Sequence, residues 1–318
     1  MTRMALGAPA QPLGSHAMTV HTRPLPVTAT AEDPARIRAA GDLRLLTWPA
    51  LEESGADAVV TTRAGGVSDG PYATLNLSLS VGDDPAHVLE NRRRLAQAMG
   101  ARLDDFVFTR QVHGSGVRVV GEADAGRGAF SLDDAVPDAD ALVTRSPGVL
   151  LAILTADCVP IVLHDPVAGV LACVHAGWRG TVARVSAAAL AAMQTLGSRP
   201  SQVIAGLGPA ASPARYQVGP DVHQAVTDAF GEAADDFLRP DGPPHRWLLD
   251  LWAANRFLLR EAGVTAAQVH VTNLPTGPLD TTGTSDGYFF SDRAARPCGR
   301  LALVARLRAG QQHLDVTT

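Results

Sequence analysis

Runs of apolar residues in the middle of the chain predict buried β-strands. The segments GVLLAIL (148–154), VPIVLHD (159–165) and VLACVHAG (170–177) are apolar at almost every position, as is typical of strands covered on both faces. The turn sequence PVAG (166–169) separates the last two segments, so we predict that they pair as a hairpin. Shorter apolar runs predict two more strands near the C-terminus, at VHVTN (269–273) and LALVARL (301–307).

Segments with apolar residues at helical spacing lie between and after these runs. DPAHVLENRRRLAQAMG (84–100) begins with an aspartate and a proline that suit the first turn of a helix, and Gly100 can end it. Its arginine run, 92–94, is expected to lie mostly on the solvent side. Three further helices are predicted at TVARVSAAALAAMQTLG (181–197, capped by Thr181), PDVHQAVTDAFG (220–231) and LLDLWAANRFLLREAG (248–263). The interspersed helices and strands predict a mixed α/β fold.

The two ends of the chain lack such patterns. Residues 1–42 are rich in Ala, Pro, Thr and Gly and are predicted to be a disordered N-terminal tail. Residues 43–308 are predicted to form a single catalytic α/β domain, because no internal repeat or second linker interrupts them, and 309–318 to form a short C-terminal tail. The longest apolar run, around 148–163, is interrupted by Asp157 and is too short to span a bilayer.

Composition then excludes several classes of function. The 318 residues carry a net charge of −5, which gives no electrostatic basis for binding nucleic acid, and we expect neither nucleic-acid nor membrane partners. The chain contains no lysine, which excludes a lysine Schiff base and a lysine-bearing phosphate loop. Three cysteines are too few, and odd in number, for a disulfide framework, and no signal peptide is evident, so we predict a cytoplasmic protein with reduced thiols.

A few polar residues interrupt the apolar pattern and are the candidates for chemistry. Cys158 lies at the junction of two predicted strands, where side chains converge in many α/β proteins. His175 is followed by AGWRG, whose glycines permit close approach of the backbone, and His113 lies between a predicted short strand (105–112) and two glycines. Three other polar positions are interpreted as structural: Cys173 in the core, Cys298 in a loop, and His164 in a turn or at the surface.

The residue types at Cys158, His113 and His175 allow two kinds of site. One thiolate and two imidazoles would make a zinc site with an open fourth position. The same residues could instead be a cysteine nucleophile activated by a histidine. Neither C-x-x-C nor H-x-x-x-H spacing is present, so the pattern by itself leaves both open. In a metal site, each imidazole must lie within about 8 Å of the Cys158 sulfur.

Six motifs follow one another along the chain: TTRAGGVSDGPYATLNLSLSVGDDPAHVLENRRRL, QVHGSGV, DADALVT, LTADCVPIVLHDP, VHAGWRGT and FFSDR. Together they resemble, over about residues 43–308, the multicopper polyphenol oxidase (laccase-like) family. That family is now regarded as purine nucleoside phosphorylases and includes the bacterial peptidoglycan editing factor. The resemblance implies a four-layer α/β/β/α sandwich related to cysteine hydrolase-like toxins. It also implies a metal site formed by His113, Cys158 and His175.

The resemblance further implies a zinc-dependent purine nucleoside phosphorylase, with copper as the alternative ion. Its expected substrates are adenosine, inosine, guanosine and methylthioadenosine together with phosphate, and adenosine deaminase activity is expected beside phosphorolysis. A monomer or small homo-oligomer is expected. Where relatives often carry further cysteines, this chain has Ala214, Arg215 and Pro275, so a thiol-rich copper site is not expected, while the three-ligand set is intact.

Other residues receive roles on chemical grounds. Asp157, next to Cys158, is the candidate acid/base for attack of water on C6 of adenine. Guanidinium groups suit bidentate phosphate binding, and the chain has no lysine to take that role. Contacts with the substrate are therefore expected from five cationic or polar side chains: Arg63, Asn76, Gln111, Arg179 and Arg293.

Three other functions compete with this assignment, and one of them, a non-catalytic binding protein, is disfavoured by the complete ligand set. A copper-dependent polyphenol oxidase follows from the family's older name, but laccase-type trinuclear copper uses many histidines, typically in H-x-H pairs, and this chain has no such pair. The third is a metal-free Cys–His hydrolase or amidase that edits peptidoglycan precursors, in which Cys158 attacks an acyl carbon. Dependence of the activity on metal discriminates between them.

Overall fold

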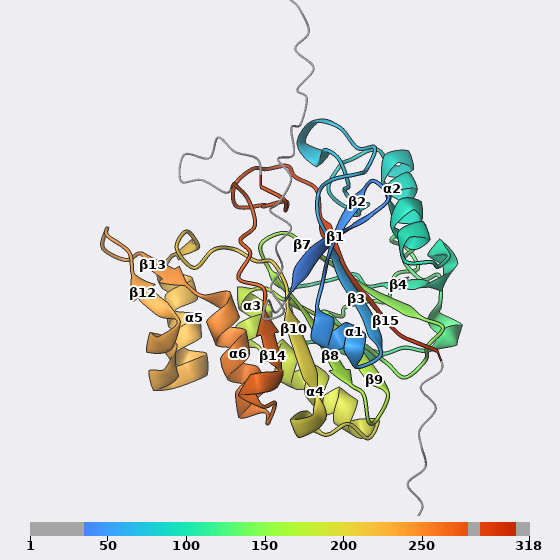
Figure 1. The fold of residues 1–318 in the computed structure, drawn as a ribbon. Coiled ribbons are helices and arrows are strands. Elements are labelled where there is room, and N and C mark those ends of the chain that lie inside the picture. The colour runs from blue at the N-terminus through green and yellow to red at the C-terminus, as the bar shows by residue number, and fades with distance from the viewer. Residues whose placement is uncertain (1–34, 279–286, 310–318) are drawn as a thin grey trace, which may run out of the picture.

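Two six-stranded β-sheets lie face to face in the computed structural model, which describes residues 35–278 and 287–309 (Figure 1). The first sheet has the strand order β1 (Arg36–Ala40), β2 (Leu43–Thr47), β3 (Ala56–Thr61), β15 (Leu301–Leu307), β7 (Leu150–Thr155) and β4 (Phe106–Phe108). The second has the order β14 (Val269–Val271), β10 (Ile204–Leu207), β8 (Val159–Asp165), β9 (Val170–Ala176), β6 (Ala141–Thr144) and β5 (Val117–Val119). A small third sheet has the order β11 (Gln217–Val218), β13 (Trp247–Leu249) and β12 (Leu238–Pro240).

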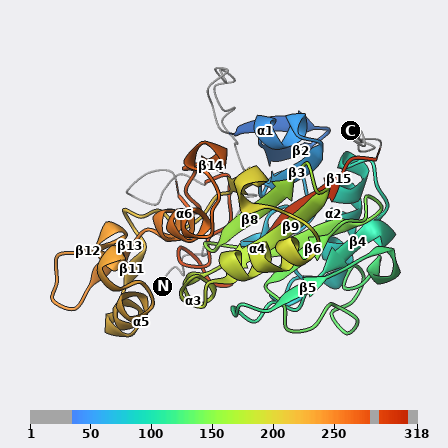
Figure 2. The ribbon, with the colours of Figure 1, turned by 90° about the horizontal axis from the view of Figure 1, so that it is seen from below.

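The α-helices are α1 (Pro49–Glu53), α2 (Pro85–Ala98), α3 (Trp178–Val182), α4 (Val185–Thr195), α5 (Pro220–Phe230) and α6 (Leu251–Glu261). Short 3₁₀ helices occupy Gly70–Tyr72, Leu103–Asp105, Glu122–Asp124, Pro200–Gln202, Gly231–Asp236 and Ala266–Gln268. α2 packs on the outer face of the first sheet through Leu95 and Met99, and α4 on the outer face of the second through Leu190 and Met193. The third sheet and α5 lie at one end of the molecule, beside α6 (Figure 2). Each helix in the described ranges is too short or too polar to cross a membrane.

The space between the two large sheets is filled by side chains that alternate along their strands. In β7, Leu151 and Ile153 face the second sheet, and in β9, Leu171 and Cys173 face the first. Cys173 is fully buried there, so the prediction that it fills the core is confirmed. His175 lies two residues further along β9, so its side chain projects from the same face of the strand.

The predicted central hairpin is confirmed. β8 and β9 pair antiparallel across the turn at 166–169, with Pro160 opposite His175. The strands predicted before this hairpin and at the C-terminal end are β7 and β15, and they pair with each other in the first sheet. Since helices and strands alternate along the chain, the mixed α/β class is confirmed as well.

The first strand lies earlier in the chain than the sequence predicts. β1 lies within the segment 1–42 that the sequence predicts to be a disordered tail, yet Arg36–Ala40 pairs antiparallel with β2. The reason for this correction is that an edge strand needs only one neighbouring backbone, and its largely exposed side chains carry no periodic signal. The tail residues 1–34 and 310–318 lie outside the described part of the chain.

The predicted helix 181–197 is two helices in the structure. α3 already begins at Trp178, and Thr181 is a buried residue within it rather than an N-cap. Arg184 then adopts a left-handed backbone with φ 62°, which separates α3 from α4. The helix predicted at 248–263 begins only at Leu251 as α6, because residues 248 and 249 belong to β13.

Arg92 contradicts the expectation that the arginine run 92–94 faces solvent. Its side chain is 1% exposed, and its guanidinium carbon lies 4.0 Å from the centre of the Phe108 ring. The guanidinium donates to three main-chain oxygens, those of Leu77, Gly128 and Ala129. These hydrogen bonds offset the cost of burying the cation, although burial lowers the pKa of Arg92 to about 9.

His164 is buried, although the sequence predicts a turn or surface position. It is 2% exposed at the end of β8, and its Nδ1 atom lies 2.9 Å from the hydroxyl oxygen of Ser54. The segment that follows α1 covers this end of the strand, which the apolar pattern of β8 does not reveal. Burial lowers the pKa of His164 to about 4, and the nearby carboxylate of Asp165 opposes this shift.

We therefore expect the protein to lose stability as the pH falls from 6.5 toward 4. The unfolded chain takes up a proton at His164 near pH 6.5, but the folded protein resists protonation until about pH 4, so the loss of unfolding free energy is on the order of 3 kcal/mol. Urea unfolding between pH 7 and pH 4 measures this loss. His164→Asn should flatten the pH dependence, whereas His245→Asn, at an exposed position, should not. If the unfolding free energies of both variants depended equally on pH, the loss of stability would not come from protonation of His164.

Candidate metal centre and active site

The three residues implied as metal ligands meet at one end of the central hairpin. Their donor atoms, one each from His113, Cys158 and His175, lie within 4.8 Å of one another. The two imidazole rings stand edge to face with their centroids 4.8 Å apart. Burial increases across the set, from the exposed His113 through the partly exposed Cys158 to His175, which is 3% exposed. The expected proximity is confirmed, and the group opens to solvent on the side of His113.

Strand register brings Cys158 and His175 together. Cys158 directly precedes β8, and His175 lies near the end of β9 opposite Pro160. Gly177 lets the chain pass close to the thiol, since a Cβ atom built at this position would lie 2.8 Å from the Cys158 sulfur. The prediction that the glycines after His175 permit close backbone approach is therefore confirmed at this residue.

Two residues of the site have left-handed backbones. The φ angle is 60° at His113 and 79° at Asp157, a region that residues other than glycine rarely adopt. Asp157 is held by its carboxylate, which accepts hydrogen bonds from the hydroxyl of Thr276 at 2.5 Å and from the main-chain N–H of Arg293 at 2.7 Å. Such backbone conformations persist where surrounding contacts hold them, and they are concentrated at functional sites.

Asp140 holds the loop of His113 against the strand of His175, although it was not among the residues predicted from sequence. Its buried carboxylate accepts hydrogen bonds from the main-chain N–H groups of Val112, His113 and Gly114, at 3.2, 3.0 and 2.7 Å. The same carboxylate lies 2.8 Å from Nδ1 of His175. A signal was present, because DADALVT places this acid directly before an apolar strand, where an unpaired carboxylate would be costly.

The surroundings of Cys158 stabilise a thiolate. Burial by itself raises the pKa of the thiol, but His175 and His113 outweigh burial and lower it to about 6. Burial lowers the pKa of His175, whereas the Cys158 thiolate and the hydrogen bond to Asp140 raise it to about 9. Burial raises the pKa of Asp140, but hydrogen bonds from His175 and from the N–H of Gly114 lower it by more. Cys158 is thus ionised near neutral pH, as a metal ligand or nucleophile must be.

Asn76 and Gln111, two of the residues expected to contact the substrate, support the main chain in this structure, and their contact with the substrate stays a prediction. Asn76 is fully buried, and its amide group hydrogen-bonds partners in its own loop and the main chain of Arg300. Gln111 pairs with the main chain of Leu154, donating at 2.7 Å and accepting at 2.8 Å. Both side chains satisfy buried main-chain groups, which a spacing argument cannot distinguish from substrate binding.

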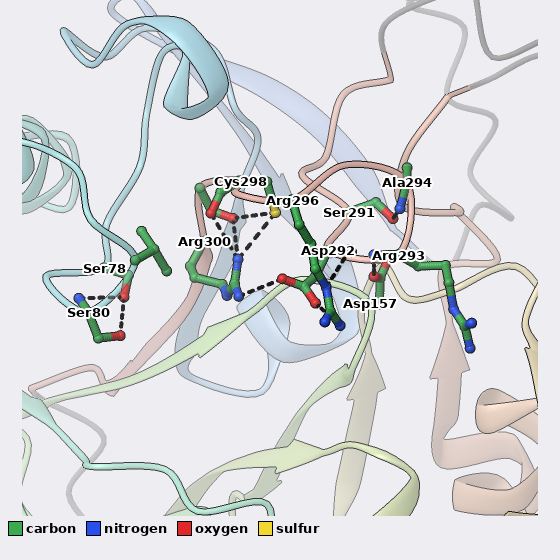
Figure 3. A network of polar contacts seen from close by, with 12 residues as sticks. Ser78, Ser80, Asp157, Ser291, Asp292, Arg293, Ala294, Arg296, Cys298 and Arg300 are labelled. Atoms are coloured by element: carbon green, nitrogen blue, oxygen red, sulfur yellow. Dashed lines mark hydrogen bonds and ion pairs between the residues drawn. The ribbon is translucent and has the colours of Figure 1, made fainter.

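Arg293 is the candidate phosphate-binding residue that the structure links most directly to Cys158. Its main-chain N–H donates to Asp157, the neighbour of Cys158 (Figure 3). Its guanidinium is exposed, donates to the main-chain oxygen of Gln217, and lies 5.1 Å from the centre of the Tyr216 ring. Tyr216 was not predicted. Burial raises the pKa of the Tyr216 hydroxyl to about 12, and the negative charge of the Cys158 thiolate adds to this shift.

The other two candidate arginines have different surroundings. Arg179 is exposed in α3 and stacks on Trp178, with 4.4 Å between its guanidinium carbon and the ring centre. Arg63 is partly buried, donates through Nε to the main-chain oxygen of Ala73, and lies 4.9 Å from the centre of the Phe290 ring. Arg293 thus contacts Asp157 directly, whereas Arg179 stacks on Trp178 and Arg63 contacts Ala73 and Phe290.

A polar network lies beside Asp157 (Figure 3). Asp292 accepts a hydrogen bond from Arg300 at 2.9 Å and pairs with Arg296 at 2.5 Å. Arg300 also donates to the main-chain oxygen of Cys298 at 2.9 Å. Cys298 is a loop residue, as predicted, but it is only 4% exposed, and burial raises the pKa of its thiol. These ion pairs hold the segment that carries Arg293 next to Asp157.

Comparisons with known proteins agree with this arrangement. Residues 57–308 match the family model described as multi-copper polyphenol oxidoreductase laccase. A Deinococcus radiodurans protein named purine nucleoside phosphorylase is 48% identical over 205 residues, which cover 64% of this chain and 74% of that protein. A protein named adenosine deaminase RL5, from an unknown prokaryotic organism, is 39% identical over 217 residues, which cover 68% and 82% of the two chains. The crystal structure of YlmD from Geobacillus stearothermophilus shares the mixed α/β single-domain fold, with a TM-score of 0.80, 36% identity and coverage of 87% of this chain and 99% of YlmD.

Proposed function

The chain belongs to the multi-copper polyphenol oxidoreductase laccase family, and on that premise we propose that it is a zinc-dependent purine nucleoside phosphorylase with adenosine deaminase activity. The resemblance found in the sequence is thereby confirmed at the level of the family. Relatives named purine nucleoside phosphorylase and adenosine deaminase support purine nucleosides and phosphate as the substrates. The observation that carries the metal assignment is the convergence of one thiolate and two imidazoles within 4.8 Å.

The donor set suits a single zinc ion. Tetrahedral zinc, with bonds of about 2.0–2.3 Å, holds its ligand atoms roughly 3.5 Å apart. The donor atoms of His113, Cys158 and His175, now up to 4.8 Å apart, would have to draw in by about an ångström. Three protein ligands leave a fourth coordination position, which is the arrangement of catalytic zinc sites. When bound, the ion supplies Lewis-acid chemistry at neutral pH.

The same geometry favours zinc chemistry over laccase chemistry. Within the described residues, one group of three or more histidine, cysteine or acidic side chains is close enough to hold an ion, and it consists of His113, Cys158 and His175. A single three-ligand set offers one thiolate and two imidazoles, which is too few histidines for a trinuclear copper cluster. Substitution chemistry at one closed-shell ion fits this set better than the multi-electron oxidation of phenols.

Residue roles follow for the two reactions. In phosphorolysis, a phosphate oxygen forms a bond to C1′ of the ribose, the bond from C1′ to N9 breaks, and the purine leaves with a proton. Arg293, with Arg179 and Arg63 as further candidates, holds the phosphate through paired N–H donors. In deamination, water replaces the amino group at C6 and ammonia leaves, with Asp157 proposed as the proton carrier. Its hydrogen bond from the main chain of Arg293 keeps both residues beside Cys158.

We further propose that the layers seen here form the four-layer α/β/β/α sandwich implied by the resemblance. α2 covers the outer face of the first sheet, and α4 and α6 cover that of the second. A relationship with cysteine hydrolase-like toxins, and a monomer or small homo-oligomer in solution, stay predictions.

One assay tests the proposed function. Zinc-loaded protein is incubated with adenosine, with and without phosphate, and the products are separated. We expect adenine and ribose 1-phosphate only when phosphate is present, and inosine without phosphate. Removing the metal with dipicolinate should lower both activities by at least about 10³-fold, and added zinc should restore them, because the ion supplies several kcal/mol of transition-state stabilisation.

The competing functions predict activity on other substrates. Full activity on an acyl substrate after chelation would support the metal-free Cys–His hydrolase or amidase. Oxidation of phenols that depends strictly on copper would support the polyphenol oxidase. Either result, together with no turnover of adenosine by the zinc-loaded protein, would overturn the proposed function.

A further inference from the structure

One buried carboxylate connects the segments that carry both histidine ligands. Asp140 directly precedes β6, and its side chain contacts the loop of His113 and the ring of His175. The main chain of Asp140 adds two hydrogen bonds. Its carbonyl oxygen accepts from the N–H of His175 at 2.7 Å, and its N–H donates to the carbonyl oxygen of Gly116 at 2.9 Å. The polar groups of Asp140 therefore act together on two segments that are far apart in sequence.

The contact with His175 determines which ring nitrogen is available to a metal. A carboxylate only accepts hydrogen bonds, so Nδ1 of His175, which lies 2.8 Å from Asp140, must carry the proton of that contact. In the neutral ring, Nε2 then keeps its lone pair and is the nitrogen left to face Cys158. Because His175 is only 3% exposed, solvent offers little to replace Asp140 as the partner of Nδ1.

The contacts with the loop position the second imidazole. His113 has a left-handed backbone and an exposed side chain, so neither its own preference nor burial holds it in place. Three successive N–H groups, those of residues 112–114, converge on the carboxylate of Asp140. Removing this charge would leave three donors without their acceptor and release the loop.

We infer that Asp140 is a positioning residue, which sets both the tautomer of His175 and the spacing of the two imidazoles and thereby raises the affinity of the site for zinc. The inference rests on the proposed metal site. Carboxylates that orient histidine ligands of zinc in this way contribute about 10–100-fold to metal affinity.

The chain offers a matched control in Asp165. This residue is also fully buried, and it ends β8 at the opposite end from Cys158, about 20 Å away along a strand of seven residues. Its carboxylate accepts three main-chain hydrogen bonds, from Val167, Ala168 and Arg199. Replacing Asp165 by asparagine therefore disturbs the same number of main-chain contacts without touching a proposed ligand.

The test compares wild type, Asp140→Asn and Asp165→Asn by competition for zinc with a chelator of known affinity, and by urea unfolding of the zinc-free proteins. We expect Asp140→Asn to weaken zinc binding by about 10–100-fold and Asp165→Asn to change it by less than about twofold, at comparable losses of folding stability. With cobalt in place of zinc, the thiolate-to-metal absorption band should change in Asp140→Asn only. Equal zinc affinities of the two variants would overturn the inference.

Its failure is distinguishable from failure of the proposed function. If the wild-type protein does not bind zinc, both the proposed function and the inference about Asp140 are wrong. If the wild type binds zinc and Asp140→Asn binds it equally well, only the inference is wrong. If Asp140→Asn does not fold, nitrogen-15 NMR of the zinc-loaded wild type decides the matter through His175. We expect the metal on Nε2 and the proton on Nδ1, and a metal-bound Nδ1 would overturn the inference.

Discussion

Replacing Cys158 by alanine should remove the bound zinc and lower phosphorolysis and deamination by at least about 10³-fold, since a catalytic ion supplies several kcal/mol. The thiolate is the anionic donor of the set, while His113 and His175 bind as neutral imidazoles. We expect two imidazoles alone, one of them exposed, to bind zinc too weakly to retain it in buffer. Zinc content per chain and turnover of adenosine measure the effect.

The matched control is Cys173→Ala. Cys173 lies on the same face of β9 as His175, but its sulfur is fully buried between the sheets, 3.8 Å from the main-chain oxygen of Leu151. Removing it leaves a small cavity, at a cost of about 1 kcal/mol, and takes away no ligand. This variant should keep both zinc and activity. A Cys158→Ala protein that still holds one zinc per chain and turns over adenosine would place the metal elsewhere.

A methyl group at residue 177 should have the second-largest effect. A Cβ atom built at Gly177 lies 2.8 Å from the Cys158 sulfur and 3.4 Å from Cδ2 of His113, so Gly177→Ala must displace one ligand or both. Overpacking of this kind costs about 1–3 kcal/mol, which corresponds to about 10–100-fold in zinc affinity if the strain is relieved on loss of the metal. Chelator competition measures the affinity, and the loss of activity should follow it at limiting zinc.

Gly148→Ala provides the comparison. Neither glycine has a positive φ, so the substitution itself is conformationally acceptable at both positions. At Gly148 the nearest atom, Oε1 of Glu122, is 3.6 Å from the added Cβ, which is an ordinary contact. We expect the zinc affinity of Gly148→Ala to match that of the wild type. If Gly177→Ala matched it too, the thiolate would have more freedom than the structure indicates.

Much of the scaffold that carries the site was predictable from local pattern. The two strands of the central hairpin are apolar almost throughout, and a turn sequence separates them, so their pairing required no knowledge of the rest of the fold. That pairing places His175 opposite Pro160 and therefore near Cys158. The third ligand, His113, could be connected to them only through the resemblance, because it lies 45 residues before Cys158 and no metal-binding spacing links the two.

Residues whose partners are distant in sequence were the hardest to assign. Arg92 was predicted to face solvent from its neighbours in sequence, yet two loops outside α2 supply the carbonyl oxygens that accept its hydrogen bonds. Asn76 and Gln111 are polar residues in family motifs, but their amide groups are taken up by Arg300 and Leu154. Polarity and spacing cannot separate a side chain that supports the main chain from one that binds a ligand.

Local pattern was enough to predict the strands of the hairpin, the mixed α/β class, and Cys158, His113 and His175 as candidates either for zinc binding or for a Cys–His nucleophile. Periodicity and residue type suffice for these, because they reflect burial and chemistry at each position. The contacts by which Asp140 joins His113 to His175, and Asp157 accepts a hydrogen bond from Arg293, could be learned only from the folded chain. These partners are 26 to 35 residues apart around Asp140 and 136 apart for Asp157, and they meet only when loops pack against the ends of the sheets.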